Sequence, residues 1–134
     1  MRVANWPSQY HRAVASARTV PFRWGVNDCV LFAAYVADAI SDLGVTQKFK
    51  AKYHWHDEES AKEIIRKAGS LDALVQEFMG PPVPWAWLST GDVVLAESEG
   101  KTLLTVHDGS NLLYPSSTGI AALPLACAKH GWRV

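Results

Sequence analysis

The chain has 134 residues, of which 49% are hydrophobic and 19% charged, so we expect one folded domain over residues 1–134 with a single core. Thirteen basic residues balance thirteen acidic ones, and the lack of a basic excess argues against a nucleic-acid-binding protein. No apolar run approaches the roughly 20 residues of a membrane-spanning helix, and residues 1–14 lack the apolar centre of a signal peptide. We therefore expect no transmembrane segment and synthesis in the cytoplasm.

The first predicted helix starts at residues 5–7, Asn-Trp-Pro, and runs to about Ala17. Proline suits the start of a helix because its missing N–H would have no helical partner there. A connector over residues 19–26 follows, and Pro21 and Gly25 within it argue against a continuous helix.

A second predicted helix covers about residues 29–40 and is almost continuously apolar. Asn27 or Asp28 can accept hydrogen bonds from the exposed N–H groups at its start, and the helix ends near Gly44. Since a helix that is apolar on most sides is buried, we expect this one to lie at the centre of the domain. Residues 45–57 are rich in aromatic side chains and are predicted to be irregular.

Two shorter helices are predicted next. The first begins at residues 57–59, Asp-Glu-Glu, whose negative charge suits a helix N-terminus, and it has an apolar edge around Ile65. Ser70 caps the second, in which apolar residues recur at helical spacing over residues 71–78. Gly80 ends that helix.

From Gly91 onward the hydrophobic period changes to two, which indicates β-strands. Glu99-Gly100 and Asp108-Gly109 are turn signals. The predicted strands cover residues 92–97, 102–107, 111–114 and 119–123. Helices followed by antiparallel strands predict an α+β fold.

Cys29 would lie in the first turn of the central helix. Partial positive charge at a helix N-terminus stabilises a thiolate and lowers the pKa of the thiol, which favours a nucleophile. The alternative is that Cys29 is a small buried apolar residue. Cys127 is the second cysteine, and because a cytoplasmic domain of this size needs no disulfide, we expect both thiols to be reduced.

Several short motifs surround this cysteine. Residues 21–29, Pro-Phe-Arg-Trp-Gly-Val-Asn-Asp-Cys, place an aromatic–glycine pair before Asp-Cys and an apolar helix. Residues 91–94, Gly-Asp-Val-Val, start the first strand, and residues 105–109 form the next hairpin. These motifs resemble NlpC/P60-type domains, which are cysteine proteins with a papain-like fold. With the closing Gly-Ile at residues 119–120 and residues 128–134, they also resemble uncharacterised phage and prophage proteins encoded among tail genes.

The resemblance implies a papain-like domain in which a central cysteine-bearing helix packs on a C-terminal antiparallel meander. It also implies Cys29 as nucleophile and a histidine base at about Leu103, where leucine cannot accept a proton. His107 is the candidate base on the same face of that strand, but four residues span about 13 Å, so it would need a register shift or bulge to reach Cys29. Asp28 is a further catalytic candidate, although neighbours at a helix start rarely face each other.

The remaining histidines provide weaker signals. His54, His56 and Asp57 form a His-x-His-Asp cluster without a fourth ligand, so we predict no metal site and no cofactor. His11 and His130 belong to no motif and are expected to be surface or packing residues.

Three tryptophans are candidate binding residues. Trp24 belongs to the motif before Cys29, and Trp85 and Trp87 follow the proline-rich residues 81–84 on a connector. We expect one of the latter two to pack in the core. Two exposed rings would suit a partner protein, or sugar stacking on peptidoglycan.

The sequence and the resemblance leave two candidate functions. The first is a tail tip or assembly protein that moves from the host cytoplasm to the virion tail and contacts other tail proteins. Its hydrolase activity is doubtful because general-base assistance is worth about 10²–10⁴-fold in rate. The alternative is a thiol peptidase or amidase that cleaves peptidoglycan stem peptides, with Cys29 attacking and His107 as base. A small-molecule or lipid-handling thiol enzyme has no specific support in the sequence.

Overall fold

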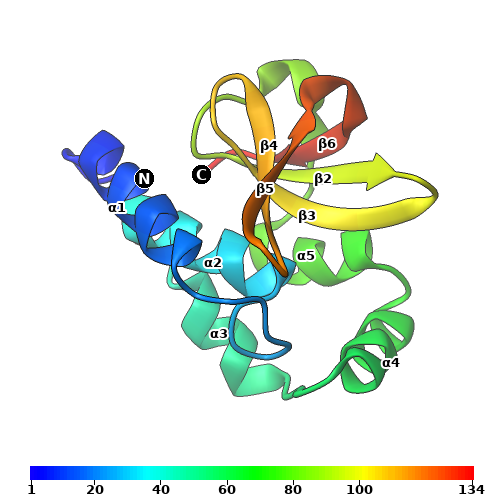
Figure 1. Ribbon diagram of the computed structural model, residues 1–134. Coiled ribbons are helices and arrows are strands. Elements are labelled where there is room, and N and C mark those ends of the chain that lie inside the picture. The colour runs from blue at the N-terminus through cyan, green and yellow to red at the C-terminus, as the bar shows by residue number, and fades with distance from the viewer.

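The structure is a computed structural model that describes all residues, 1–134. Five α-helices precede a six-stranded antiparallel sheet (Figure 1), which confirms the predicted α+β class. The helices are α1 (Trp6–Arg18), α2 (Cys29–Ile40), α3 (Val45–Lys52), α4 (Glu58–Ala68) and α5 (Leu71–Met79). The strands are β1 (Val83–Pro84), β2 (Val93–Ser98), β3 (Lys101–His107), β4 (Asn111–Ser116), β5 (Gly119–Pro124) and β6 (Ala128–Trp132). The short 3-10 helices are η1 (Trp85–Trp87) and η2 (Leu125–Cys127). None of the α-helices has the length and apolar character needed to cross a bilayer.

The strand order in the sheet is β1-β6-β2-β3-β4-β5. Strands β2 to β5 form the expected meander, but β6 returns to the far side of β2 and β1 pairs with its outer edge. The sequence pattern predicts neither β1 nor β6, so the predicted C-terminal meander holds for β2 to β5 and is incomplete at the β2 edge. Strand β1 has only two residues, and β6 (Ala-Lys-His-Gly-Trp) lacks the β-branched residues typical of a strand.

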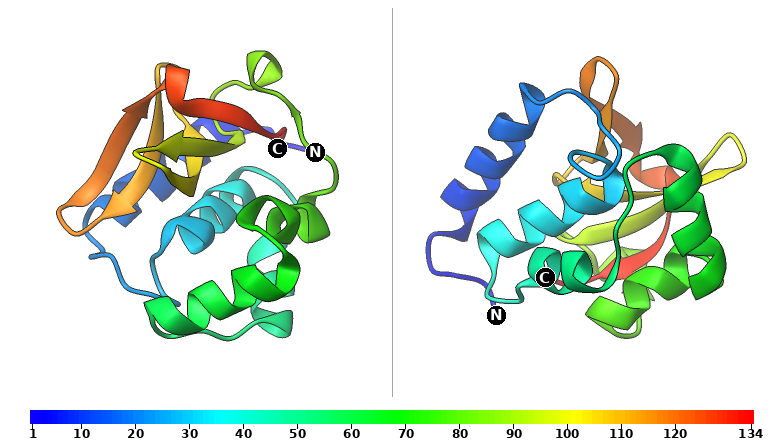
Figure 2. Two further views of the ribbon diagram at one scale, coloured as in Figure 1. Left: turned by 90° about the vertical axis from the view of Figure 1, so that its right-hand side faces the viewer. Right: turned by 90° about the horizontal axis from the view of Figure 1, so that it is seen from below.

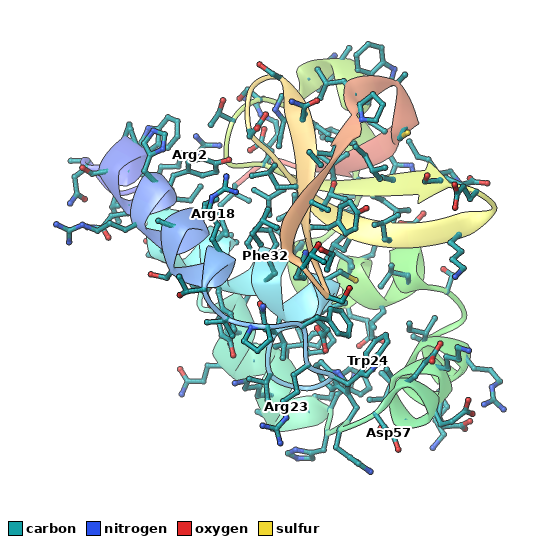
Figure 3. The ribbon with its side chains drawn as sticks, viewed as in Figure 1. Arg2, Arg18, Arg23, Trp24, Phe32 and Asp57 are labelled. Carbon is teal, nitrogen blue, oxygen red and sulfur yellow. The ribbon has the colours of Figure 1, made fainter.

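The two faces of the sheet bury different clusters. Helices α2 and α5 lie on one face, and Figure 2 (left) shows the helical layer below the sheet. The main core lies between these layers, and Phe32 of α2 is at its centre (Figure 3). Strands β2 and β3 contribute Val93, Leu95, Leu104 and Val106 to it. The opposite face carries a smaller cluster of Leu88, Val94, Ala96 and Leu112.

Helix α2 is the buried central helix, as predicted. Leu31, Phe32, Val36 and Ile40 are at most 1% exposed, and α2 lies against α1, α3, β3 and β4. Burial of this helix from several sides fixes the position of its first residue, Cys29, relative to the sheet.

Helix α3 occupies part of the segment predicted to be irregular, so that prediction is wrong. The carboxylate of Asp38, in α2, accepts hydrogen bonds from the backbone N–H groups of Val45 (2.7 Å) and Thr46 (2.9 Å). Phe49 is buried beneath the helix at 3% exposure. The groups that stabilise α3 come from another element, which explains why local sequence did not reveal it.

The two ends of the chain lie side by side (Figure 2). Arg2 Nε donates to the carbonyl oxygen of Val134 at 2.7 Å, and Arg2 Nη2 donates to Asp92 Oδ1 at 2.9 Å. The same carboxylate oxygen accepts from the backbone N–H of Val134 at 2.9 Å. Asp92 is buried at 2% exposure, so this terminal clasp joins both ends to the start of β2.

Candidate functional site

Cys29 is the first residue of α2, directly after its N-cap. The side chain of Asp28 accepts a hydrogen bond from the backbone N–H of Leu31 at 2.9 Å, which confirms the predicted cap. Helix α2 therefore places the thiol at its N-terminal end, beside the sheet.

Asp28 holds three segments together. Its Oδ2 accepts from the backbone N–H of Gly25 at 2.9 Å and from Trp55 Nε1 at 2.6 Å, in addition to the cap bond on Oδ1. Gly25 has a positive φ of 78°, and a Cβ there would lie 2.2 Å from the carbonyl oxygen of Trp55. The motif before Cys29 therefore brings the 19–28 connector against the segment that carries Trp55.

A cavity of about 490 Å³ opens beside Cys29. It lies between the start of α2, helices α4 and α5, and the β2–β3 hairpin. Its lining consists mostly of apolar side chains: Trp24, Asp28, Cys29, Val30, Phe49, Trp55, Glu58, Ala61, Lys62, Ile64, Ile65, Leu71, Leu74, Lys101 and Thr102. This volume lies within the roughly 300–1,000 Å³ of small-ligand sites.

The thiol of Cys29 is not activated by its helix. Burial raises its pKa from the ordinary 9.0 to about 11. Hydrogen bonding by the backbone at Leu104 acts in the opposite direction, and the charge of Asp28 raises the pKa further. The expectation that the helix N-terminus lowers this pKa is wrong, because desolvation of the thiolate outweighs the stabilising N–H groups.

His107 does not line the cavity. It pairs with Leu112 across β3 and β4, and Leu112 belongs to the cluster on the face opposite the main core. Leu103 packs against that same cluster, so both positions lie on the face away from α2. The Nδ1 of His107 accepts a hydrogen bond from the backbone N–H of Gly109 at 2.9 Å, and burial lowers the pKa of its imidazole, opposed by Asp92 and Asp108.

The other histidines also lie outside the lining. His54 and His56 are on the segment between α3 and α4, and no group of three or more histidine, cysteine or carboxylate side chains is arranged to bind a metal. His130 pairs with Asp72 at 2.9 Å between β6 and α5. No imidazole is therefore placed to serve as a base for Cys29 from the walls of the cavity.

The three candidate tryptophans fall into two places. Trp24 lines the cavity, and Figure 3 shows it on the side of the molecule that faces α4. Trp85 and Trp87 lie on η1, beside β6, and are 56% and 62% exposed. The expectation that one of them packs in the core is wrong, since both rings face solvent and neither lines the cavity.

Several lining residues were not recognised as site residues in the sequence. Trp55 and Phe49 reach the cavity from the segment predicted to be irregular, and Ile64 and Ile65 form the apolar edge of α4. That edge was visible as a pattern, but an apolar helix edge normally indicates core packing. Only the arrangement of α4 against α5 shows that it faces a cavity.

The comparisons with known proteins give one match. The model of a family described as a domain of unknown function (DUF6950) matches residues 1–134. No curated protein and no solved structure matches the chain. Because the family match extends from α1 to β6, the cysteine, the cavity and the terminal clasp all fall within it, and the chain belongs to the DUF6950 family.

Proposed function

We propose that this chain is a tail-associated protein of a phage or prophage, with an NlpC/P60-like papain fold, that acts in tail assembly or at the tail tip without thiol hydrolysis. The fold part of the proposal is supported by the motifs at residues 21–29 and 91–94, and by a cysteine at the head of a central helix that packs on an antiparallel sheet. The tail context is supported by the resemblance of the same motifs and of residues 128–134.

The environment of Cys29 carries the non-hydrolytic part of the proposal. A thiol with a pKa of about 11 is ionised in roughly one molecule in 10⁴ at pH 7. Papain-like catalysis needs a thiolate and a histidine that receives or returns the proton. The raised pKa of the Cys29 thiol and the lack of a histidine among the lining residues both argue against this chemistry.

The exposed rings of Trp85 and Trp87 support a contact with neighbouring subunits. Large exposed aromatic side chains are enriched at protein interfaces, where they bury area with few rotatable bonds. Both rings lie on η1, away from the cavity. A neighbouring subunit that contacts them would therefore leave the cavity accessible.

The alternative is a peptidoglycan amidase or peptidase, and one observation favours it. Cys29 lies at the wall of a cavity large enough for a short peptide segment, with backbone groups of α2 and Leu104 close to the sulfur. Such groups could stabilise an oxyanion if a base were supplied by a conformational change.

An assay on peptidoglycan stem peptides separates the two functions. The wild-type protein and the Cys29→Ser variant should release new amino groups at the same background rate. Turnover that exceeds background and disappears in Cys29→Ser would establish the hydrolase instead. The tail context is tested separately by mass spectrometry of tails purified from particles of the encoding genome. Absence of the chain from those tails and from their assembly intermediates would overturn it.

A further inference from the structure

The cavity beside Cys29 combines an apolar interior with an unpaired positive charge at its opening. We propose that it binds a medium-chain monocarboxylate, with the alkyl chain in the cavity and the carboxylate at Lys101 and Thr102. This inference concerns a ligand and does not depend on the tail context.

The interior of the cavity suits an alkyl chain. Leu71, Leu74 and Phe49, each at most 7% exposed, belong to its lining, as do Ile64 and Ile65 of α4. An apolar chain that enters this space removes apolar surface from water on both sides, which is favourable by about 25 cal/mol per Å².

Two polar groups of the lining at the start of α2, the carboxylate of Asp28 and the thiol of Cys29, do not call for a charged ligand. Asp28 already accepts three hydrogen bonds, from Leu31, Gly25 and Trp55. The thiol of Cys29 is neutral at pH 7 and behaves as a small apolar group. The part of the cavity beside the start of α2 therefore offers the methyl end of an alkyl chain apolar contact and no unpaired polar group.

The charges at the opening select an anion. Lys62 and Glu58 form an ion pair at 3.1 Å and neutralise each other. Three lysines of the protein, Lys52, Lys62 and Lys129, form ion pairs with glutamates. Lys101 forms none, and it lines the cavity together with the neighbouring Thr102. Both side chains are exposed at the start of β3, so an ammonium and a hydroxyl stand at the opening as donors for a carboxylate.

Isothermal titration with dodecanoate, dodecanol and dodecylamine, all below their aggregation limits, tests the charge requirement on the unaltered protein. Dodecanoate should bind most tightly, dodecanol more weakly and dodecylamine most weakly, because the chain is shared and the head group differs. Equal binding of the three probes, or no binding of dodecanoate, would overturn the proposal. Binding to phosphatidylglycerol vesicles without binding to monomeric dodecanoate would also overturn it, in favour of a membrane surface.

Two variants locate the ligand. Lys101→Ala should weaken dodecanoate binding by about 3- to 5-fold, as expected for an exposed ion pair, and leave dodecanol unchanged. Lys48→Ala, on the surface of α3 and outside the lining, is the matched control and should change neither. Ile65→Trp should fill the cavity and abolish binding of both probes, with circular dichroism to verify that the variant is folded.

The thiol gives an independent readout that needs no change in the cavity. In a Cys127→Ser background, saturating dodecanoate should slow the alkylation of Cys29 at least several-fold, because the chain covers the sulfur. An unchanged alkylation rate at saturation would place the ligand elsewhere and overturn the proposal.

Discussion

At the scale of single residues, Cys29 shows how two effects of one position oppose each other. The start of α2 offers N–H groups that stabilise a thiolate, yet the same position is enclosed by the sheet and the cavity walls. Desolvation is the larger effect and raises the pKa to about 11. Cys29 therefore lies where a nucleophilic cysteine would lie, but the raised pKa disfavours its thiolate form.

The raised pKa predicts how stability depends on pH. Between pH 9 and pH 11 the unfolded chain releases the Cys29 proton while the folded protein retains it. The unfolded state is favoured as the pH rises through this window, so the protein should lose about 2–3 kcal/mol of stability from this group. Urea unfolding at pH 8 to 11 measures the change.

Cys29→Ala is the control for that experiment. Tyr10, whose pKa burial raises to about 12, contributes equally to both proteins, so the difference between their pH profiles isolates Cys29. Parallel profiles from pH 9 to pH 11 would show that the thiol is not desolvated as described.

The sequence identified part of the site at this scale. Cys29, Asp28 and Trp24 were predicted site residues, and all three line the cavity. His107 could not be excluded from sequence, because strand alternation gives relative faces and not which face meets α2. Trp55 was not recognised because its role depends on a tertiary hydrogen bond to Asp28, 27 positions earlier.

At the scale of elements, the origin of the N-terminal cap explains why the sequence predicts α2 and α5 but not α3. Asp28 and Ser70 lie directly before α2 and α5 and accept from Leu31 and Ala73, so the local pattern was sufficient. The cap of α3 comes from Asp38, seven residues before Val45. A cap supplied by another element leaves no signal in the adjacent sequence.

Replacing the capping residues Asp28 and Ser70 by alanine should lower the free energy of unfolding by different amounts. Asp28→Ala removes the cap of α2 and also leaves the N–H groups of Gly25 and Trp55 without a partner. We expect a loss of about 3 kcal/mol or more in the free energy of unfolding. Ser70→Ala removes a cap alone and should cost about 1 kcal/mol. Urea denaturation of both variants measures the difference, and equal losses would mean that the contacts of Asp28 to the two loops add nothing.

At the scale of the whole molecule, the terminal clasp joins segments from opposite ends of the sequence. Arg2 and Val134 meet at the buried carboxylate of Asp92, which also accepts from the backbone N–H of Ser89 at 2.9 Å. In the sequence, Asp92 is recognisable only as a strand residue in a Gly-Asp motif. Arg2 lies about 90 residues before it and Val134 about 40 after it, so no local pattern could indicate these two contacts.

Removing the charge of Asp92 should destabilise the fold as a whole. Asp92→Asn leaves the guanidinium of Arg2, which is 19% exposed, without a counter-ion. We expect a loss of about 2–4 kcal/mol in the free energy of unfolding, measured by thermal and urea denaturation. Glu97→Gln, which breaks the exposed pair with Lys129, is the control and should cost less than about 1 kcal/mol. Similar small losses in both variants would show that the clasp is not a stabilising contact.

The position of β6 has a consequence for the order of folding during synthesis. Residues 128–132 are made after every other strand, yet they lie between β1 and β2 in the sheet. A folding intermediate that contains only the β2–β5 meander therefore has an unpaired edge at β2. Since long-range strand pairing is slow and open edges invite association with other chains, the folding chain should be most prone to aggregate in the interval before β6 pairs with β2.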